Sequence, residues 1–147
     1  MGKTSFSGPV YGAKSLLWSV TSKDVGNSTT ANTVAAIIVP AGEDWIISDF
    51  HVFRGSTHST AFVASLVDDS TAIATVAITS SLADQNGSTR IPSTGGEYTG
   101  QAVATGSSLA FTIHNGGSSV ASSQVMAWVY GFPRWLDTST LGAGPGN

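Results

Sequence analysis

The 147-residue chain contains three histidines, a residue type that can bind metal ions. They are His51, His58 and His114. Each lies in or beside an apolar run that is typical of a β-strand, and the first two could approach each other across a hairpin. A metal site needs three or four convergent ligands, and the nearest carboxylates show no recognisable ligand spacing. We therefore expect hydrogen-bonded or solvated histidines and no metal site.

Serine and acidic side chains are the candidates for a nucleophile or a general acid. No serine sits in a Gly-x-Ser-x-Gly elbow, and no set of Ser, His and Asp stands out. The adjacent acids Glu43-Asp44 and Asp68-Asp69 fall at predicted turns, where capping and solvation explain them better than the defined separation of glycoside hydrolysis. We therefore predict no catalytic residue, no cofactor and no enzyme activity.

Tryptophan offers a different chemistry, because a sugar ring can stack on an indole face. The candidates are Trp18, Trp45, Trp128 and Trp135. In a small β-domain, however, a tryptophan more often belongs to the core or to an interface. Binding of a host glycan is accordingly the alternative for these residues and not the first choice.

Charge is scarce and evenly scattered. Only 10% of the residues are charged, against roughly 25% in an average soluble protein. The six basic residues form no cationic stripe that could neutralise a run of phosphates or an anionic lipid surface. We expect neither nucleic acid nor a membrane as a partner. There is no cysteine for a disulfide or a thiolate zinc site, and no apolar run long enough for a signal peptide or a membrane span, so we expect synthesis in a cytoplasm.

The elements that must position any site are β-strands. Apolar runs separated by Gly, Asn, Ser and Asp recur along the chain, and Ser and Thr replace charge as the outward-facing polar residues. The predicted strands are 16–20, 34–39, 44–54, 62–67, 71–79, a short one near 89–91, 108–114 and 124–132. Residues 21–32 are predicted to form a polar loop. Short strands about ten residues apart predict a single all-β domain, a β-sandwich of the jelly-roll kind.

Two of these strands have unusual patterns. The strand 44–54 alternates imperfectly, which indicates either a bulge or burial on both faces. The strand 124–132 is apolar on both faces, so it is either central within one monomer or covered by a second subunit or an arm. Its larger face supplies the candidate subunit interface, which consists of Met126, Trp128, Tyr130 and Phe132.

The sandwich, residues 16–136, is expected to carry an extended N-terminal arm, residues 1–15, and a flexible Gly-rich C-terminal tail, residues 137–147. The residues proposed to make the arm's contacts are Phe6, Ser7, Gly8, Pro9, Val10 and Tyr11. Proline favours an extended path while glycine stays adaptable, and the apolar side chains offer contact area that a free arm cannot bury alone. The arm either contacts another protein or folds as a strap onto its own sandwich.

Three segments have a pattern in common with known proteins. They are VPAGEDWII at 39–47, which runs into a strand at 50–53, ATGSSLAFTI at 104–113 with the closing VYGF at 129–132, and FSGPVYGAKS at 6–15. The first two resemble small β-sandwich virion proteins of tailed bacteriophages. The third resembles the N-terminal segment of phage head decoration (cement) proteins, and the likeness covers most of the chain from residue 6 to residue 132.

This resemblance implies a non-enzymatic structural protein on the outer capsid surface of a virion, made in the host cytoplasm. Such a protein binds the major capsid protein, commonly as a homotrimer, and stabilises the shell by bridging its subunits. The arm would then contact the shell. The alternative function is a receptor- or glycan-binding module at a fibre tip or knob.

Overall fold

The structure, a computed structural model, describes residues 10–25, 32–55, 62–78, 85–91, 100–114 and 123–135. These ranges contain ten β-strands, which confirms the all-β prediction. The strands are β1 Val10–Tyr11, β2 Ser15–Val25, β3 Asn32–Ile38, β4 Glu43–Arg54, β5 Phe62–Asp68, β6 Thr71–Ile78, β7 Gln85–Arg90, β8 Gln101–Val103, β9 Ser108–His114 and β10 Ser123–Trp135. Within the described ranges, no helix is long and apolar enough to cross a membrane.

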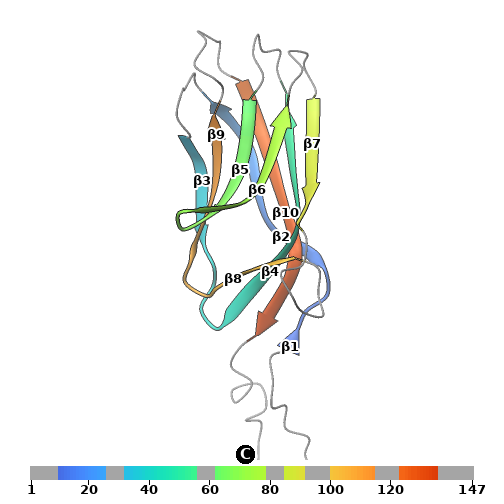
Figure 1. Cartoon of the computed structure of the whole chain (residues 1–147), viewed down its shortest axis with the longest axis vertical. Helices are drawn as coiled ribbons and strands as arrows, with labels where there is room; N and C mark the ends of the chain where they lie inside the picture. Colours follow the sequence, from blue (N-terminus) through green and yellow to red (C-terminus); the bar gives the residue numbers. More distant parts are fainter. Residues whose placement is uncertain are drawn as a thin grey trace, which may run out of the picture.

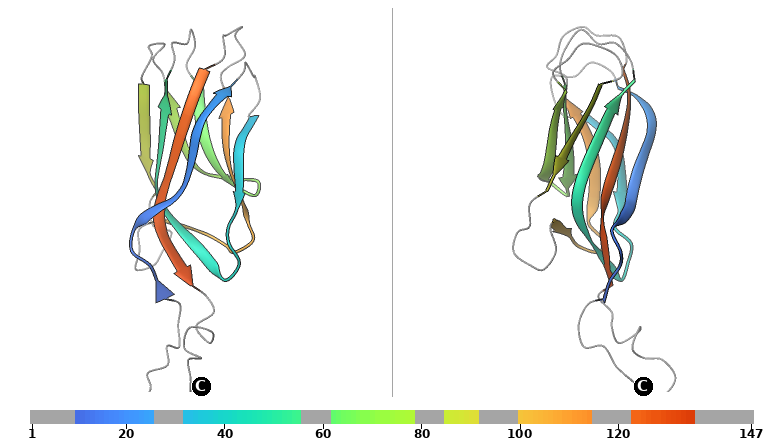
Figure 2. Two further views of the ribbon diagram at one scale, coloured as in Figure 1. Left: turned by 180° about the vertical axis from the view of Figure 1, so that it is seen from behind. Right: turned by 90° about the vertical axis from the view of Figure 1, so that its right-hand side faces the viewer.

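The strands form two antiparallel sheets that pack face to face (Figures 1 and 2). In sheet B the order is β3-β9-β5-β6, and in sheet A the neighbours of the central pair β10-β4 include β2 on one side and β7 on the other. The chain therefore passes repeatedly from one sheet to the other, and the orders 2-10-4-7 and 3-9-5-6 are those of two interleaved Greek keys. This is the topology of a jelly roll, so the predicted sandwich is confirmed.

The central pair of sheet A changes its outer partners part-way along. At the upper end of Figure 1, β2 and β7 flank the pair, whereas at the lower end the short strands β1 and β8 replace them. The change lies close to a register shift, since Tyr130 pairs with Asp49 but Gly131 pairs with Ile47. Ser48 is the extra residue, which confirms the predicted bulge in β4.

The bulge is held in place by close packing and by a side-chain hydroxyl. A Cβ atom added to Gly131 would lie 2.0 Å from the carbonyl oxygen of Ile46, so only glycine fits there. Ser48 Oγ donates to Asp49 Oδ2 at 2.7 Å and lies 3.2 Å from the Tyr130 carbonyl oxygen, a second acceptor for the same hydroxyl hydrogen. The bulge thus sets which outward-pointing residues of β10 lie beside which outward-pointing residues of β4.

The core lies between the two sheets and is built from alternate residues of their strands. Phe50 of sheet A and Phe111 of sheet B are both fully buried and meet edge to face, with 5.9 Å between ring centroids. Val125 and Val129 of β10 are also buried in this core. β10 is therefore a central strand whose inner face belongs to the monomer core.

Several strands differ from the sequence-based expectations. β7 spans Gln85–Arg90 where a short strand near 89–91 was predicted, and β10 continues to Trp135 where an end at 132 was predicted. β2 continues to Val25, through the first part of the predicted polar loop, because residues 23–25 pair with the start of β10. The short strands β1 and β8 were not predicted. Each pairs with the end of a long central strand. It is therefore a strand because of this pairing partner and not because of its own sequence pattern.

Candidate functional site

The outer face of sheet A carries the side chains that could form a site. Trp128 of β10 pairs with His51 of β4, and His51 pairs with Ser88 of β7, so these residues form one row across three strands. In the next row Tyr130 pairs with Asp49. Because successive side chains of a strand point to opposite faces, these residues face away from the core.

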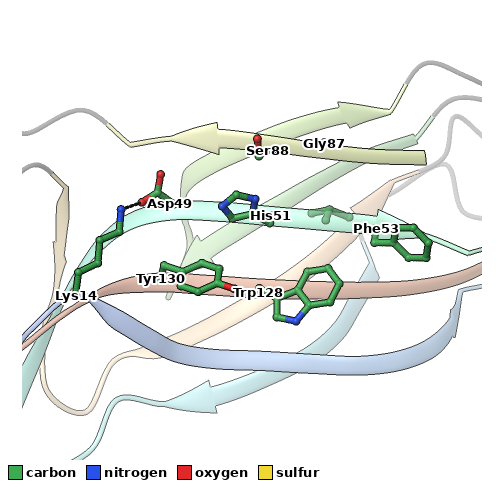
Figure 3. Close-up of a pocket in the computed structure, with 9 residues that line it drawn as sticks. Lys14, Asp49, His51, Phe53, Gly87, Ser88, Trp128 and Tyr130 are labelled. Carbon is green, nitrogen blue, oxygen red and sulfur yellow. Dashed lines mark ion pairs between the residues drawn. The ribbon is translucent and has the colours of Figure 1, made fainter. Parts of the chain in front are cut away.

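A groove of about 630 Å³ lies on this face. Figure 3 shows its lining, in which the rings of β10 lie beside the β4 side chains and Ser88 lies across β4 from them. The lining residues are Lys14, Asp49, His51, Val52, Phe53, Gly87, Ser88, Trp128 and Tyr130. Nearly all of them belong to paired strands, so the groove has a rigid floor.

Aromatic rings form much of the groove. His51 and Tyr130 meet edge to face, with 5.4 Å between ring centroids and 84° between the ring planes. Trp128 and Phe53 lie further along the same face (Figure 3), and both are partly buried. The groove therefore offers ring faces and edges held by neighbouring strands.

An ion pair lies at the end of the groove opposite Phe53 (Figure 3). Lys14 Nζ is 2.5 Å from Asp49 Oδ2, and the two side chains are 47% and 15% exposed. Asp49 Oδ2 also accepts the hydrogen bond from Ser48. The groove thus contains one positive and one negative charge, and their sum is zero. Lys14 lies between β1 and β2, so the N-terminal part of the described chain supplies this end.

The predicted subunit interface divides between the groove and its surroundings. Trp128 and Tyr130 line the groove, whereas Met126 and Phe132 do not, although both are partly buried. Within the described part of the chain, no second layer of strands covers this face of β10. Of the two sequence-based readings, the central position of β10 is confirmed, and the contact with a second subunit stays a prediction.

The last two predicted arm residues, Val10 and Tyr11, form β1 and pair with the end of β10. The amide of Gly12 then donates to the Pro133 carbonyl at 2.7 Å. This part of the arm therefore lies on its own sandwich. The other predicted arm residues lie outside the described ranges; they are Phe6, Ser7, Gly8 and Pro9.

The strand end that receives β1 is tied to the rest of the sandwich. Arg134 pairs with Asp44 across β10 and β4, and Asp44 Oδ1 accepts the amide of Thr105 at 2.9 Å. Asp44 is buried, with 6% of its surface exposed. The root of the arm thus rests on a strand that is fixed both by the sheet ladder and by this ion pair.

The other sequence-based candidates do not converge on the groove. Trp45 is buried and donates from Nε1 to Glu43 at 2.7 Å, and Trp18 packs against the core. His58 lies outside the described ranges. Among the residues that the structure describes, no three His, Asp or Glu side chains are placed to hold a metal ion.

The predicted turn role is confirmed for Asp69, whereas Asp44 is a buried residue of β4 and is not solvated at a turn. Asp44 binds the amide of Thr105, as described above, and Asp69 Oδ1 accepts the amide of Ser108 at 2.9 Å. Asp69 has a positive φ of 51°, a conformation that aspartate tolerates better than most residues. Burial raises the pKa of its neighbour Asp68, and the charge of Asp69 raises it further, whereas a hydrogen bond with Ser107 acts in the opposite direction.

No protein-family model and no curated protein matches the chain. Among solved structures, a chain in the structure of infectious bursal disease virus Gt strain is similar with a TM-score of 0.36 and 14% identity, over 90% of this chain and 38% of that one. A chain in the crystal structure of the infectious bursal disease virus VP2 subviral particle is similar with a TM-score of 0.25 and 16% identity, over 90% and 42%. This chain spans about two fifths of the length of the chains it matches.

Proposed function

We propose that this chain is a structural virion protein, which binds the outer surface of a phage capsid and stabilises the shell by bridging subunits of the major capsid protein. The observation that carries the proposal is the attachment of the arm. β1 fixes the end of the decoration-protein-like segment 6–15 beside the end of β10. Val10 pairs with Trp135, so β1 begins at the end of the sandwich where β10 finishes.

The jelly-roll body suits this role because the described strands of both sheets enclose one continuous apolar core. A protein that binds only the assembled shell stabilises it by mass action, since binding favours the assembled state over the free subunits. If three copies form a homotrimer, three arms act on neighbouring sites, and weak individual contacts then give firm attachment.

Within this proposal the arm residues have two different tasks. Val10 and Tyr11 hold the root of the arm to β10 through the ladder. Phe6 and Pro9, together with Ser7 and Gly8, would contact the major capsid protein. Apolar and uncharged residues suit a segment that another protein's surface covers.

Removal of residues 2–9 tests the proposal while leaving β1 in place. The truncated protein should keep the circular dichroism spectrum, the melting temperature and the oligomeric state of the full chain, because the described sandwich is unchanged. Its occupancy on purified heads that lack the protein should fall by about tenfold or more, measured by quantitative gel analysis after sedimentation.

A matched truncation of residues 137–147 is the control, and it should decorate heads normally. If the protein without residues 2–9 decorates heads at full occupancy, the arm does not carry the attachment. If the full chain does not bind heads at all, while image reconstruction finds it at fibre tips, the capsid role itself is wrong.

A further inference from the structure

The chemistry of the groove restricts what it can bind. A phosphate or another anion would meet the carboxylate of Asp49, and a cation would meet the ammonium group of Lys14. A wholly apolar ligand would cover this ion pair and the hydroxyl of Ser88 without replacing their contacts with water, which is costly. The remaining class is a neutral molecule that has an apolar face and several hydroxyl groups.

We propose that this groove binds a neutral sugar ring. The proposal goes beyond the capsid role: the binding of a sugar ring does not depend on that role, whereas its use against a glycan-covered surface rests on the proposed function. A pyranose presents C–H groups on its faces and hydroxyls around its rim, and the groove offers both complements. Its volume of about 630 Å³ lies within the roughly 300–1,000 Å³ that is usual for small-molecule sites.

The positions of the groups allow each part of the sugar a partner. The rings of Trp128 and Tyr130 lie next to each other on β10, where a sugar face can stack on either (Figure 3). Sugar hydroxyls can donate to Asp49 and accept from Lys14, while Ser88 can do either. Because these groups are held by paired strands and an existing ion pair, little order has to be gained on binding.

A second subunit is the competing occupant, because Trp128 and Tyr130 belong to the predicted subunit interface. The centres of protein interfaces are depleted in charged residues. In this groove, however, an ion pair and a hydroxyl lie next to the rings, and the lysine is 47% exposed. This mixture favours a polyhydroxylated ligand over a subunit.

The proposed site needs no high affinity in a virion. Many copies on one particle would meet a glycan-covered surface at the same time, so millimolar sites would act together as a much stronger attachment. The class of ligand is therefore a neutral hexose at the exposed end of a surface glycan.

Binding is tested with the full chain and the methyl glycosides of glucose, galactose, mannose and N-acetylglucosamine. Saturation-transfer NMR detects the bound sugar, and a titration gives the dissociation constant. At least one glycoside should bind saturably, and Trp128→Ala should weaken it by about tenfold or more. Asp49→Asn should also weaken it, although less, because the amide still accepts a hydrogen bond.

Thr75→Ala is the matched control, since Thr75 is exposed on the outer face of the opposite sheet. It should bind the sugar as the unmodified chain does. Circular dichroism and melting curves establish that each variant is folded. If Trp128→Ala does not fold, Asp49→Asn and Lys14→Met decide the test, because exposed or partly exposed polar positions tolerate such changes.

Three outcomes would overturn the sugar proposal. The first is no saturable binding of any of the four glycosides. The second is unchanged affinity in the folded groove variants. The third is a loss of self-association in folded Trp128→Ala, measured by sedimentation, which would assign the groove to a second subunit. Decoration of heads is measured separately, so failure of this proposal leaves the capsid role standing.

Discussion

The outer faces of the two sheets differ, although the same alternation of side chains builds both. Sheet A presents large rings and an ion pair. Sheet B presents mostly small residues over β5, β6 and β9, which are Val63, Ser65, Val67, Thr75, Ala77, Ala110 and Thr112, although His114 ends the same row of β9 and Ile38 of β3 is 59% exposed. On this second face Ser65 and Thr75 share a hydrogen bond of 3.3 Å between their hydroxyls. Small side chains therefore cover the middle of this outer face, whereas its larger side chains lie on the edge strand β3 and at the end of β9.

The comparison indicates which side chains the fold requires and which serve another purpose. In the middle of sheet B a full core lies beneath small residues, so a buried core of this fold does not need large rings on the outward side of the same strands. The rings of Trp128 and Tyr130 are better explained by a contact with something outside the monomer. Substitutions in the shared core and on each outer face can distinguish the residues that the fold requires from those that serve a contact outside the monomer.

The largest loss of stability is expected from Phe111→Ala, because Phe111 belongs to the core that both faces share. Its ring is fully buried against Phe50, so removing it should lower the free energy of unfolding by about 3–5 kcal/mol. Denaturant unfolding measures the loss. If Trp128→Ala costs as much, the outward ring is part of the fold and the contrast between core and face fails.

The next largest effect is expected from Gly131→Ala, at the bulge that sets the outer face of sheet A. The new Cβ would lie 2.0 Å from the Ile46 carbonyl oxygen, so the backbone must move, at a cost of about 1–3 kcal/mol. Thermal unfolding gives the cost. Gly42→Ala is a control with open space around the added atom, although its φ of 84° makes that change strained as well. Equal losses would show that crowding at the bulge adds nothing.

A smaller and more telling difference is expected between the two faces. Trp128→Ala should lower the free energy of unfolding by only about 1 kcal/mol, and Thr75→Ala by less than about 0.5 kcal/mol, because neither residue belongs to the core. Sugar binding or self-association should change in the first variant alone. If the two variants behave alike in every binding measurement, the difference between the two outer faces has no functional meaning.

The ion pair of sheet A should contribute little to folding. Lys14→Met removes one partner, but the lysine is 47% exposed, so the expected loss is about 0–1 kcal/mol and should shrink as salt is added. Unfolding at low and high ionic strength measures this. A large loss that salt does not reduce would mean that the pair holds the fold together.

The smallest effect is expected from Asp68→Asn, at the end of sheet B. The folded state raises the pKa of Asp68 and therefore binds its proton more tightly than the unfolded chain. Its contribution to stability is present below about pH 4 and is lost as the pH rises through the raised pKa. The variant should lack this loss, so its stability relative to that of the unmodified chain should improve between acidic and neutral pH. The free energy of unfolding of both proteins is measured across this pH range. If it changes in parallel in the two proteins, the raised pKa does not belong to Asp68.

Much of the framework was predictable from local patterns. The strand 108–114 has the predicted bounds, because Leu109, Phe111 and Ile113 alternate cleanly with residues of the outer face. The bulge in β4 was also predictable as one of two possibilities. Both the strand and the bulge depend on residues that are neighbours in the sequence, so they can be predicted from the sequence alone.

The groove was not predictable in the same way. The sequence placed Trp128 on the larger apolar face of its strand, but the row that it forms with His51 and Ser88 depends on the pairing of β10 with β4 and of β4 with β7. Such registers are set by distant segments and by the extra residue at Ser48. The contribution of Lys14 depends in addition on the turn that follows β1, which no local pattern indicated.

The pairing of β1 with β10 also has a mechanical meaning. The two strands are antiparallel, and the chain enters β1 from the same end of the sandwich at which β10 finishes. A pull on the chain before Val10, directed away from the sandwich, therefore runs along the strand axis and loads the β1 ladder in shear. The bonds of a sheared ladder resist together, whereas those of a peeled ladder open one at a time. Tension at this end would pass through the long strands β10 and β4 into the whole of sheet A.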